Sequence, residues 1–151
     1  MKYQSTILCL FLIGADQLAK FVTLTTWSHD VEFTFFRWKL VQNSGITLGW
    51  LSFFSPTILI LLQIVALIFI YKIQLNKEIK ALIFAGGMSN IIDRFIHSAV
   101  IDYIQPKFNV FQWPAVINLA DLYITLALLL WLIHEYKEST SNSTRIKLQS
   151  E

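Results

Sequence analysis

Long apolar stretches dominate the pattern of hydrophobic and polar positions along this chain. An α-helix needs ~20 mostly apolar residues to cross the hydrocarbon core of a bilayer. Four stretches approach that length, at residues 5–27, 51–71, 79–97 and 115–133. The third is the weakest, because only residues 81–92 are free of charge. The pattern predicts four transmembrane helices.

The composition agrees with this prediction. Of the 151 residues, 55% are hydrophobic and 15% are charged, so the chain is more apolar than an ordinary soluble domain. Lys2 and the apolar run after it are similar to a secretory signal peptide, but no small-x-small cleavage site follows, and we expect the segment to stay attached. We interpret residues 1–151 as a single domain with a polar, Ser/Thr-rich, disordered cytoplasmic tail at about 138–151.

The distribution of Lys and Arg predicts the orientation, because the cytoplasmic loops of membrane proteins carry more of them. Seven fall on one side: Lys2, Lys72, Lys77, Lys80, Lys137, Arg145 and Lys147. Three fall on the other: Arg37, Lys39 and Lys107. Both termini are therefore predicted to be cytoplasmic. The net charge of +2 follows from this asymmetry and indicates no nucleic-acid partner.

Under this orientation, residues 28–50 and 98–114 face the outside. Residues 31–41 are rich in β-branched and aromatic side chains, a composition typical of a short strand or hairpin. Asn43, Gly45 and Gly49 then interrupt it. We predict an all-α membrane protein of four transmembrane helices with a small extracytoplasmic β-rich cradle.

Four aspartates lie inside or at the ends of the apolar stretches: Asp16, Asp93, Asp102 and Asp121. Ionisable groups at membrane depth are costly and usually mark sites of chemistry or transport. Asp16 and Lys20 stand four residues apart, so they share a helix face and can neutralise each other, and we favour a structural role for this pair.

The third apolar stretch combines small and polar residues. Gly86 and Gly87 suit close helix approach. Asn90 and Asp93 follow on one helix face, and Arg94 is placed to neutralise Asp93 or to reach a headgroup phosphate. Asp93 is therefore interpreted as an organiser of a polar network rather than a reacting group.

Asp102 and Asp121 are the candidate catalytic pair. Asp102 follows the third stretch, Asp121 opens the fourth, and neither has a neighbouring cation in sequence. Two carboxylates in a poorly solvated site share one proton and act together as acid and base, which is sufficient for amide hydrolysis. The alternative is that each aspartate only caps a helix end.

Other catalytic classes find little support. Cys9 is the single cysteine, and His29, His97 and His134 lack metal-ligand spacing. No serine lies in a Gly-x-Ser-x-Gly motif. We expect no metal and no cofactor. A small proton-coupled transporter or channel subunit, or an assembly scaffold using the glycines, remain as alternatives, although the inner helix halves offer no titratable partners for a proton path.

The motifs resemble one family, lipoprotein signal peptidase (signal peptidase II), an aspartyl peptidase of bacterial membranes. The resemblance covers most of the chain. Five motifs carry it, in this order: Asp16-Gln17-x-x-Lys20, Asn43-x-Gly45, Gly86-Gly87-x-x-Asn90-x-x-Asp93-Arg94, Val100-x-Asp102 and Asn118-x-Ala120-Asp121.

The resemblance implies that Asp102 and Asp121 are catalytic. It implies supporting or substrate-orienting roles for Asn43, Asn90, Asp93, Arg94, Asn118, Asp16 and Lys20. The implied substrate is a prolipoprotein carrying diacylglycerol, cut before the lipidated cysteine in the bacterial cytoplasmic membrane, with sensitivity to the cyclic peptide globomycin. From the predicted orientation we expect the site near the outer face of that membrane, and we expect a monomer. The chain departs from the family pattern at Thr47, Leu48, Ser89 and Ile117, which puts specificity and inhibitor affinity in question, not the reaction.

Overall fold

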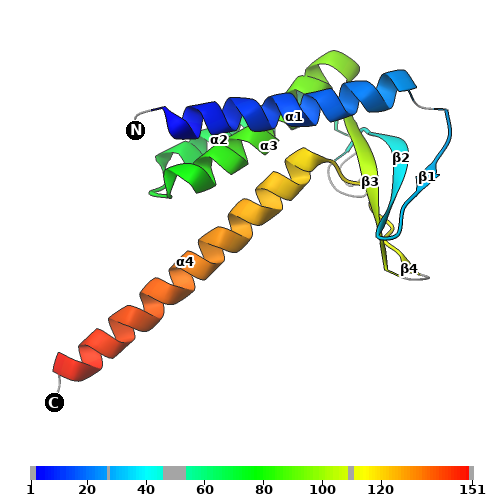
Figure 1. Cartoon of the computed structure of the whole chain (residues 1–151). Helices are drawn as coiled ribbons and strands as arrows, with labels where there is room; N and C mark the ends of the chain where they lie inside the picture. Colours follow the sequence, from blue (N-terminus) through cyan, green and yellow to red (C-terminus); the bar gives the residue numbers. More distant parts are fainter. Residues whose placement is uncertain (1–2, 27, 46–53, 109–110, 150–151) are drawn as a thin grey trace.

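The computed structural model describes residues 3–26, 28–45, 54–108 and 111–149. Within them lie four helices, α1 (Gln4–Thr26), α2 (Pro56–Lys72), α3 (Lys77–His97) and α4 (Leu119–Gln149), shown in Figure 1. By length and composition, α1 and Leu119–Thr140 of α4 can cross a membrane, and α2 is a shorter apolar helix of 17 residues. The apolar pattern therefore places helices correctly, with two clear spans among the described residues.

Helix α2 begins and ends where its sequence directs. The hydroxyl of Ser55 accepts a hydrogen bond from the Ile58 N–H at 3.4 Å, and Pro56 occupies the first turn, where its missing N–H costs nothing. Lys72 lies in the last turn, beside the negative end of the helix dipole. Most of the apolar side chains between these ends are exposed, as expected for a surface that faces lipid.

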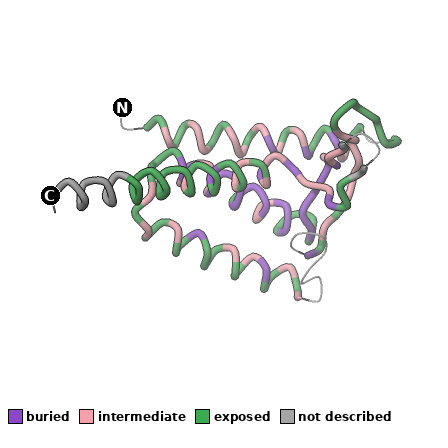
Figure 2. Tube along the Cα trace, turned by 90° about the horizontal axis from the view of Figure 1, so that it is seen from below, coloured by how far each residue is buried: buried purple, intermediate pink, exposed green. Residues whose placement is uncertain are grey.

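Helix α3 is the central element, because it packs against α1, α2 and α4. Figure 2 shows buried positions along it, while the other helices are mostly exposed on their outer faces. Its glycines permit this packing. A Cβ on Gly86 would meet the Ala120 carbonyl oxygen at 2.4 Å, and one on Gly87 would meet the Leu67 side chain at 2.8 Å. The expected close helix approach is confirmed at both residues.

An antiparallel sheet lies at one end of the helices (Figure 1). Its order is β1 (Val31–Glu32), β2 (Phe36–Asn43), β3 (Val100–Phe108) and β4 (Phe111–Gln112). In the register of β2 and β3, Val41 pairs with Asp102 and Asn43 with Val100, with an irregularity between Trp38 and Val41. The register brings two polar motifs, 59 residues apart in sequence, to one place.

The strands agree with the sequence-based expectation in one segment and differ from it in another. The strand expected within residues 31–41 is present as β1 and β2. The structure also contains β3, in a segment for which no strand was predicted, so Asp102 lies on a strand and not at a helix end. Strand pairing with β2 satisfies the main-chain groups of this segment.

The fourth helix also differs from its expected bounds. It begins at Leu119 instead of residue 115, and it continues to Gln149 through the segment expected to be a disordered tail. Each residue added to a helix forms one more hydrogen bond, which offsets the conformational entropy lost when that residue is ordered. Thr47 and Leu48 lie outside the described residues.

Candidate active site

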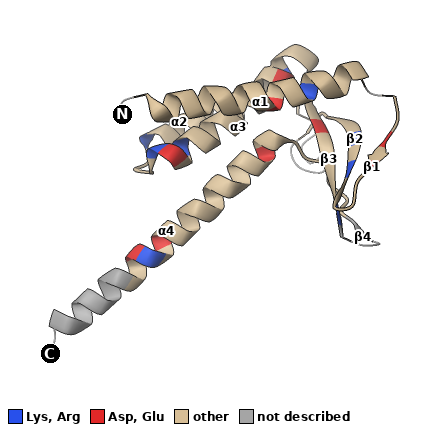
Figure 3. Cartoon of the chain, in the orientation of Figure 1, with Lys and Arg blue, Asp and Glu red and all other residues tan. Residues whose placement is uncertain are grey.

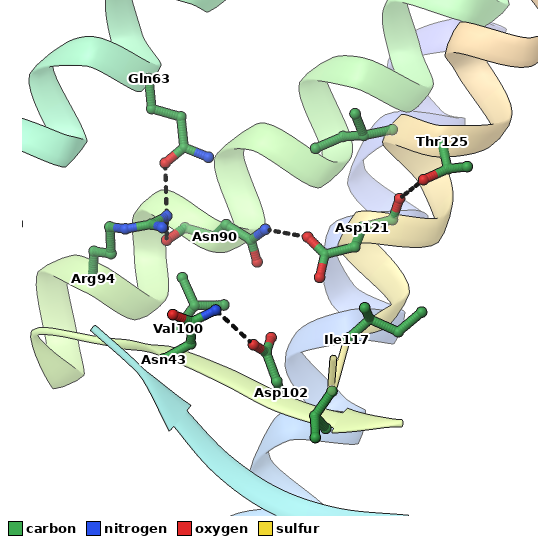
Figure 4. A pocket seen from close by; sticks show the side chains of 11 residues that line it. Asn43, Gln63, Asn90, Arg94, Val100, Asp102, Ile117, Asp121 and Thr125 are labelled. Atoms are coloured by element: carbon green, nitrogen blue, oxygen red, sulfur yellow. Dashed lines mark hydrogen bonds between the residues drawn. The ribbon is translucent and has the colours of Figure 1, made fainter. Parts of the chain in front are cut away.

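Asp102 and Asp121 line one cavity of about 370 Å³ between the helices and the sheet. Figure 4 shows both carboxylates pointing into this space, one from β3 and one from the first turn of α4. The complete lining is Asn43, Gln63, Asn90, Arg94, Val100, Asp102, Val116, Ile117, Asp121, Ile124 and Thr125. The polar motifs of the sequence therefore converge on a single space.

Asp102 is 2% exposed and is held by two side-chain amides. Asn118 Nδ2 donates to Oδ1 at 2.8 Å, and Asn43 Nδ2 donates to Oδ2 at 3.1 Å. Burial, and next the nearby Asp121 carboxylate, raise the pKa of Asp102 to about 7, against the opposing influence of these donors. Desolvation outweighs hydrogen bonding here, so Asp102 holds a proton near neutral pH.

Asp121 is both a helix cap and a cavity residue. Asp121 Oδ2 accepts from the Asn118 N–H at 3.2 Å, and Asn118 Oδ1 accepts from the Asp121 N–H at 2.9 Å. This is a reciprocal capping arrangement at the start of α4. Asn90 Nδ2 donates to the other carboxylate oxygen at 3.1 Å. The capping alternative is therefore realised for Asp121, and it fixes the carboxylate at the cavity wall.

Asn118 and Asn90 connect the two carboxylates. Asn118 Nδ2 also donates to Asn90 Oδ1 at 3.2 Å. Asn118 binds Asp102 and Asn90 binds Asp121, so the two carboxylates are linked through these two amide side chains. The hydrogen bonds given for the described residues include none directly between Asp102 and Asp121. The two acids instead face a shared polar space, in which a water molecule and a peptide bond can be placed.

Arg94 differs from its expected partnership. Its guanidinium donates to Gly45 O at 2.8 Å and to Gln63 Oε1 at 2.9 Å, whereas the ion pair given for Asp93 is with Lys20, at 2.8 Å. The Nε of Arg94 is buried with no hydrogen-bond partner. Arg94 therefore joins α3 to α2 and to the segment after β2.

Sequence analysis missed the role of Gln63. This residue is the partner of Arg94 and lines the cavity (Figure 4). The signal was available, because Gln63 is the single strongly polar side chain between Pro56 and Tyr71 of an otherwise apolar helix. A buried polar group in such a helix requires a hydrogen-bond partner.

A second polar network lies beneath the cavity and is centred on Asp16. Lys20 Nζ lies 2.7 Å from Asp16 Oδ2, so the predicted pair is confirmed. Asp16 also accepts from Ser89 Oγ at 2.6 Å and from Tyr103 Oη at 3.1 Å. Because the Asp16 side chain is fully buried and its partners lie on α3 and β3, it ties the first helix to the elements that carry the cavity.

Lys20, the partner of Asp16 on α1, also contacts α3. Lys20 Nζ donates to Asn90 Oδ1 at 3.0 Å as well, which links this lower network to the amide that holds Asp121. Gln17 Nε2 donates to Asp93 Oδ1 at 2.9 Å and to Ser89 Oγ at 2.9 Å. Figure 3 shows these charges gathered where α1 and α3 meet the sheet. Asp93 thus contacts both Lys20 and Gln17 of α1.

Comparisons with known proteins point to one family. Residues 8–137 match the family described as signal peptidase (SPase) II. The lipoprotein signal peptidase of Thermodesulfovibrio yellowstonii is 30% identical over 90% of this chain and 97% of its own length. That of Bartonella henselae is 34% identical over 83% and 84%. A solved bacterial membrane enzyme structure is 25% identical over 93% and 92%, with a TM-score of 0.77.

Proposed function

The chain belongs to the signal peptidase II family, the lipoprotein signal peptidases, and we propose that Asp102 and Asp121 are its catalytic pair. It is an aspartic peptidase of a bacterial membrane that removes signal peptides from prolipoproteins, and this activity replaces the transporter and scaffold alternatives. The observation that supports the proposed pair is that both carboxylates line the same cavity.

In the proposed reaction, one carboxyl is protonated and the other is ionised. The ionised carboxylate takes a proton from a water molecule, whose oxygen attacks the carbonyl carbon of the scissile peptide bond. The protonated carboxyl donates to the carbonyl oxygen, and a proton then passes to the leaving amine as the bond breaks. The two acids titrate as a pair, so neither is assigned alone as the base.

The surrounding residues take supporting roles in this proposal. Asn43 and Asn118 orient Asp102, while Asn90 and Asn118 orient Asp121. Arg94 Nε, buried without a partner, is a donor for a substrate carbonyl. Asp16, Lys20 and Asp93 hold α1 against α3 through their ion pairs and do not touch the reacting atoms.

We further propose the substrate form and its position. The substrate is a prolipoprotein whose cysteine carries diacylglycerol, cut before that cysteine and blocked by globomycin. Its extended segment lies against the cradle formed by residues 31–41, beside its lipid chains. The enzyme acts as a monomer with four membrane-spanning helices, at the outer face of the cytoplasmic membrane. The sheet at one end of the helices supports this arrangement (Figure 1).

The test is removal of either carboxylate. Asp102→Asn and Asp121→Asn should each lower the cleavage rate of a diacylglyceryl-modified precursor by at least ~100-fold, because one half of the acid–base pair is lost. The measurement is the initial rate in detergent micelles, at equal amounts of folded protein by size-exclusion chromatography.

Asp30→Asn is the matched control, since Asp30 is an exposed aspartate on the outer segment, 4.0 Å from Arg37, and does not line the cavity. It should cleave at the wild-type rate. Wild-type turnover in a folded Asp102→Asn or Asp121→Asn variant would reject the proposed pair.

A further inference from the structure

A second cavity of about 350 Å³ adjoins the catalytic cavity. Asn43, Asp102 and Val116 line both, so Asp102 stands at the boundary between them. A peptide bond positioned at Asp102 therefore has its two flanking segments in different surroundings. Lys39 and Val41 of its wall belong to the cradle of residues 31–41, and the roles proposed above do not say which part of the substrate this cavity holds.

The two cavities differ in chemistry. The catalytic cavity lies between the sheet and helices α2, α3 and α4, and beside its polar groups it has an apolar side formed by Val100, Val116, Ile117 and Ile124. The second lies over the sheet and is lined by Lys39, Gln42, Ser44 and Gln105, with Pro114 and Ala115. The apolar side of the first suits an apolar signal peptide. The polar chain that continues into the aqueous compartment matches the second.

Gln105 lines the second cavity, and its side-chain oxygen has no hydrogen-bond partner. Its side chain is 8% exposed, and its Nε2 donates to the Trp113 carbonyl oxygen at 3.0 Å. That bond fixes the orientation of the amide, since only the nitrogen can donate to a carbonyl. Gln105 Oε1 is buried with no hydrogen-bond partner. Buried acceptors are usually paired, and a main-chain N–H of a peptide bound in this cavity would pair this one if it reached it.

Lys39 supplies the positive charge. It lies half-buried on β2, and the ion pairs given for the described residues do not include it, whereas Arg37 and Lys107 of the same sheet pair with Glu32. The other charged group on the cavity wall is Asp102 at its boundary. A substrate carboxylate bound near Lys39 is attracted to its ammonium group, whereas a substrate cation bound beside Lys39 is repelled by it.

We propose that this second cavity binds the polypeptide on the carboxyl side of the cleaved bond, with Gln105 Oε1 accepting a main-chain N–H and Lys39 binding an acidic side chain. The inference rests on the proposed catalytic pair for its direction. It makes Lys39 and Gln105 determinants of which prolipoproteins are cut fastest, through the residues that immediately follow the modified cysteine.

The charge is tested with synthetic diacylglyceryl lipopeptides that differ only at the second and third residues after the cleaved bond, as Asp, Ala or Lys. The full-length enzyme in micelles should cleave the Asp peptide about fivefold more efficiently than the Ala peptide in kcat/KM, mainly through KM, and the Lys peptide least. Lys39→Gln should abolish this order. Lys107→Gln, an equal charge change outside the cavity, should keep it.

The acceptor is tested by replacing the same main-chain N–H groups with ester oxygens, one at a time. At one position the wild-type enzyme should lose about three- to tenfold in kcat/KM. Gln105→Leu should lose a similar factor with the amide peptide and nothing further with that ester. Equal ester losses in both enzymes, or a charge order independent of Lys39, would overturn the inference.

These outcomes are separable from those of the catalytic pair. If Asp102→Asn is inactive while Lys39→Gln keeps the wild-type order, the catalytic pair stands and the second cavity is not the binding site. If Asp102→Asn is active while the order depends on Lys39, the binding site stands and the pair fails.

Discussion

At the scale of single residues, the site works through environment rather than through unusual groups. Asp102 is an ordinary carboxyl whose pKa is raised because it is buried next to Asp121. Asp121 is fixed by its role as a cap, through bonds to and from Asn118. The hydrogen bonds that make Asp121 a helix cap also hold its carboxylate at the cavity. A structural role and a catalytic role for this aspartate are therefore compatible.

The raised pKa of Asp102 predicts a pH dependence of cleavage. The carboxyl keeps its proton below pH about 7 and loses it as the pH rises through that value. Since the reaction needs one protonated and one ionised acid, kcat should fall above about pH 7 and should also fall at low pH, when both are protonated. Initial rates between pH 4 and about 9, a range chosen to bracket the carboxyl pKa values, check this; an unchanged rate across neutral pH would contradict it.

The same shift has a consequence for stability. The folded-state pKa of Asp102 lies above its unfolded value of ~3.9, so its contribution to the free energy of unfolding is full below that value and is lost as the pH rises through about 7. Asp102→Asn cannot titrate at this position, so the part of the pH dependence of the free energy of unfolding that comes from Asp102 should be absent in this variant. Thermal unfolding midpoints in micelles at two pH values on either side of neutrality compare the two proteins.

At the scale of elements, α3 determines whether the catalytic groups meet. It carries Asn90 and Arg94 to the cavity, and its glycine faces let α2 and α4 approach. The close contact at Gly86 is with the carbonyl of Ala120, the residue before Asp121. The contact at Gly86 therefore sets both the packing of α3 against α4 and the position of Asp121.

Gly86→Ala should displace α4 and lower activity. The added methyl group meets backbone at 2.4 Å and Ile124 at 2.7 Å, and overpacking of this kind costs roughly 1–3 kcal/mol. Moving Asp121 by even part of an ångström should reduce kcat by about 10- to 100-fold. Rates and unfolding midpoints in micelles measure both effects.

Gly14→Ala is the control for this substitution. It lies on α1, where an added Cβ meets nothing within 4 Å, so its rate and stability should remain at or slightly above wild type, given the higher helix propensity of alanine. Equal behaviour of the two alanine variants would show that the α3–α4 contact does not position Asp121.

At the scale of the whole molecule, the two ends of the helical bundle differ. The sheet lies at one end, while α1 begins and α4 finishes at the other, where α2 and α3 are also connected (Figures 1 and 2). Residues of the sheet line both cavities. Lys72, at the end of α2, and Lys77, at the start of α3, flank the connection at this second end. The charge asymmetry and the architecture therefore favour one orientation, with the sheet outside.

The orientation is testable with single cysteines in a Cys9→Ser background. Thr34→Cys, exposed between β1 and β2, should react with a membrane-impermeant thiol reagent in intact cells. Gln74→Cys, exposed between α2 and α3, should react only after the cells are opened. The reverse pattern would invert the proposed orientation and place the peptidase site on the cytoplasmic side.

Sequence alone determined the features that depend on local spacing. Apolar length predicts helices, a four-residue interval predicts the Asp16–Lys20 pair, and small residues predict the close approach at Gly86. Only the tertiary structure decided features that join distant segments. These include the ion pair of Lys20 with Asp93, the contact of Gln63 with Arg94, and the pairing of β3 with β2. Their physical reason is common: a buried polar group is satisfied by whichever partner folding brings near, and sequence spacing does not state which segments meet.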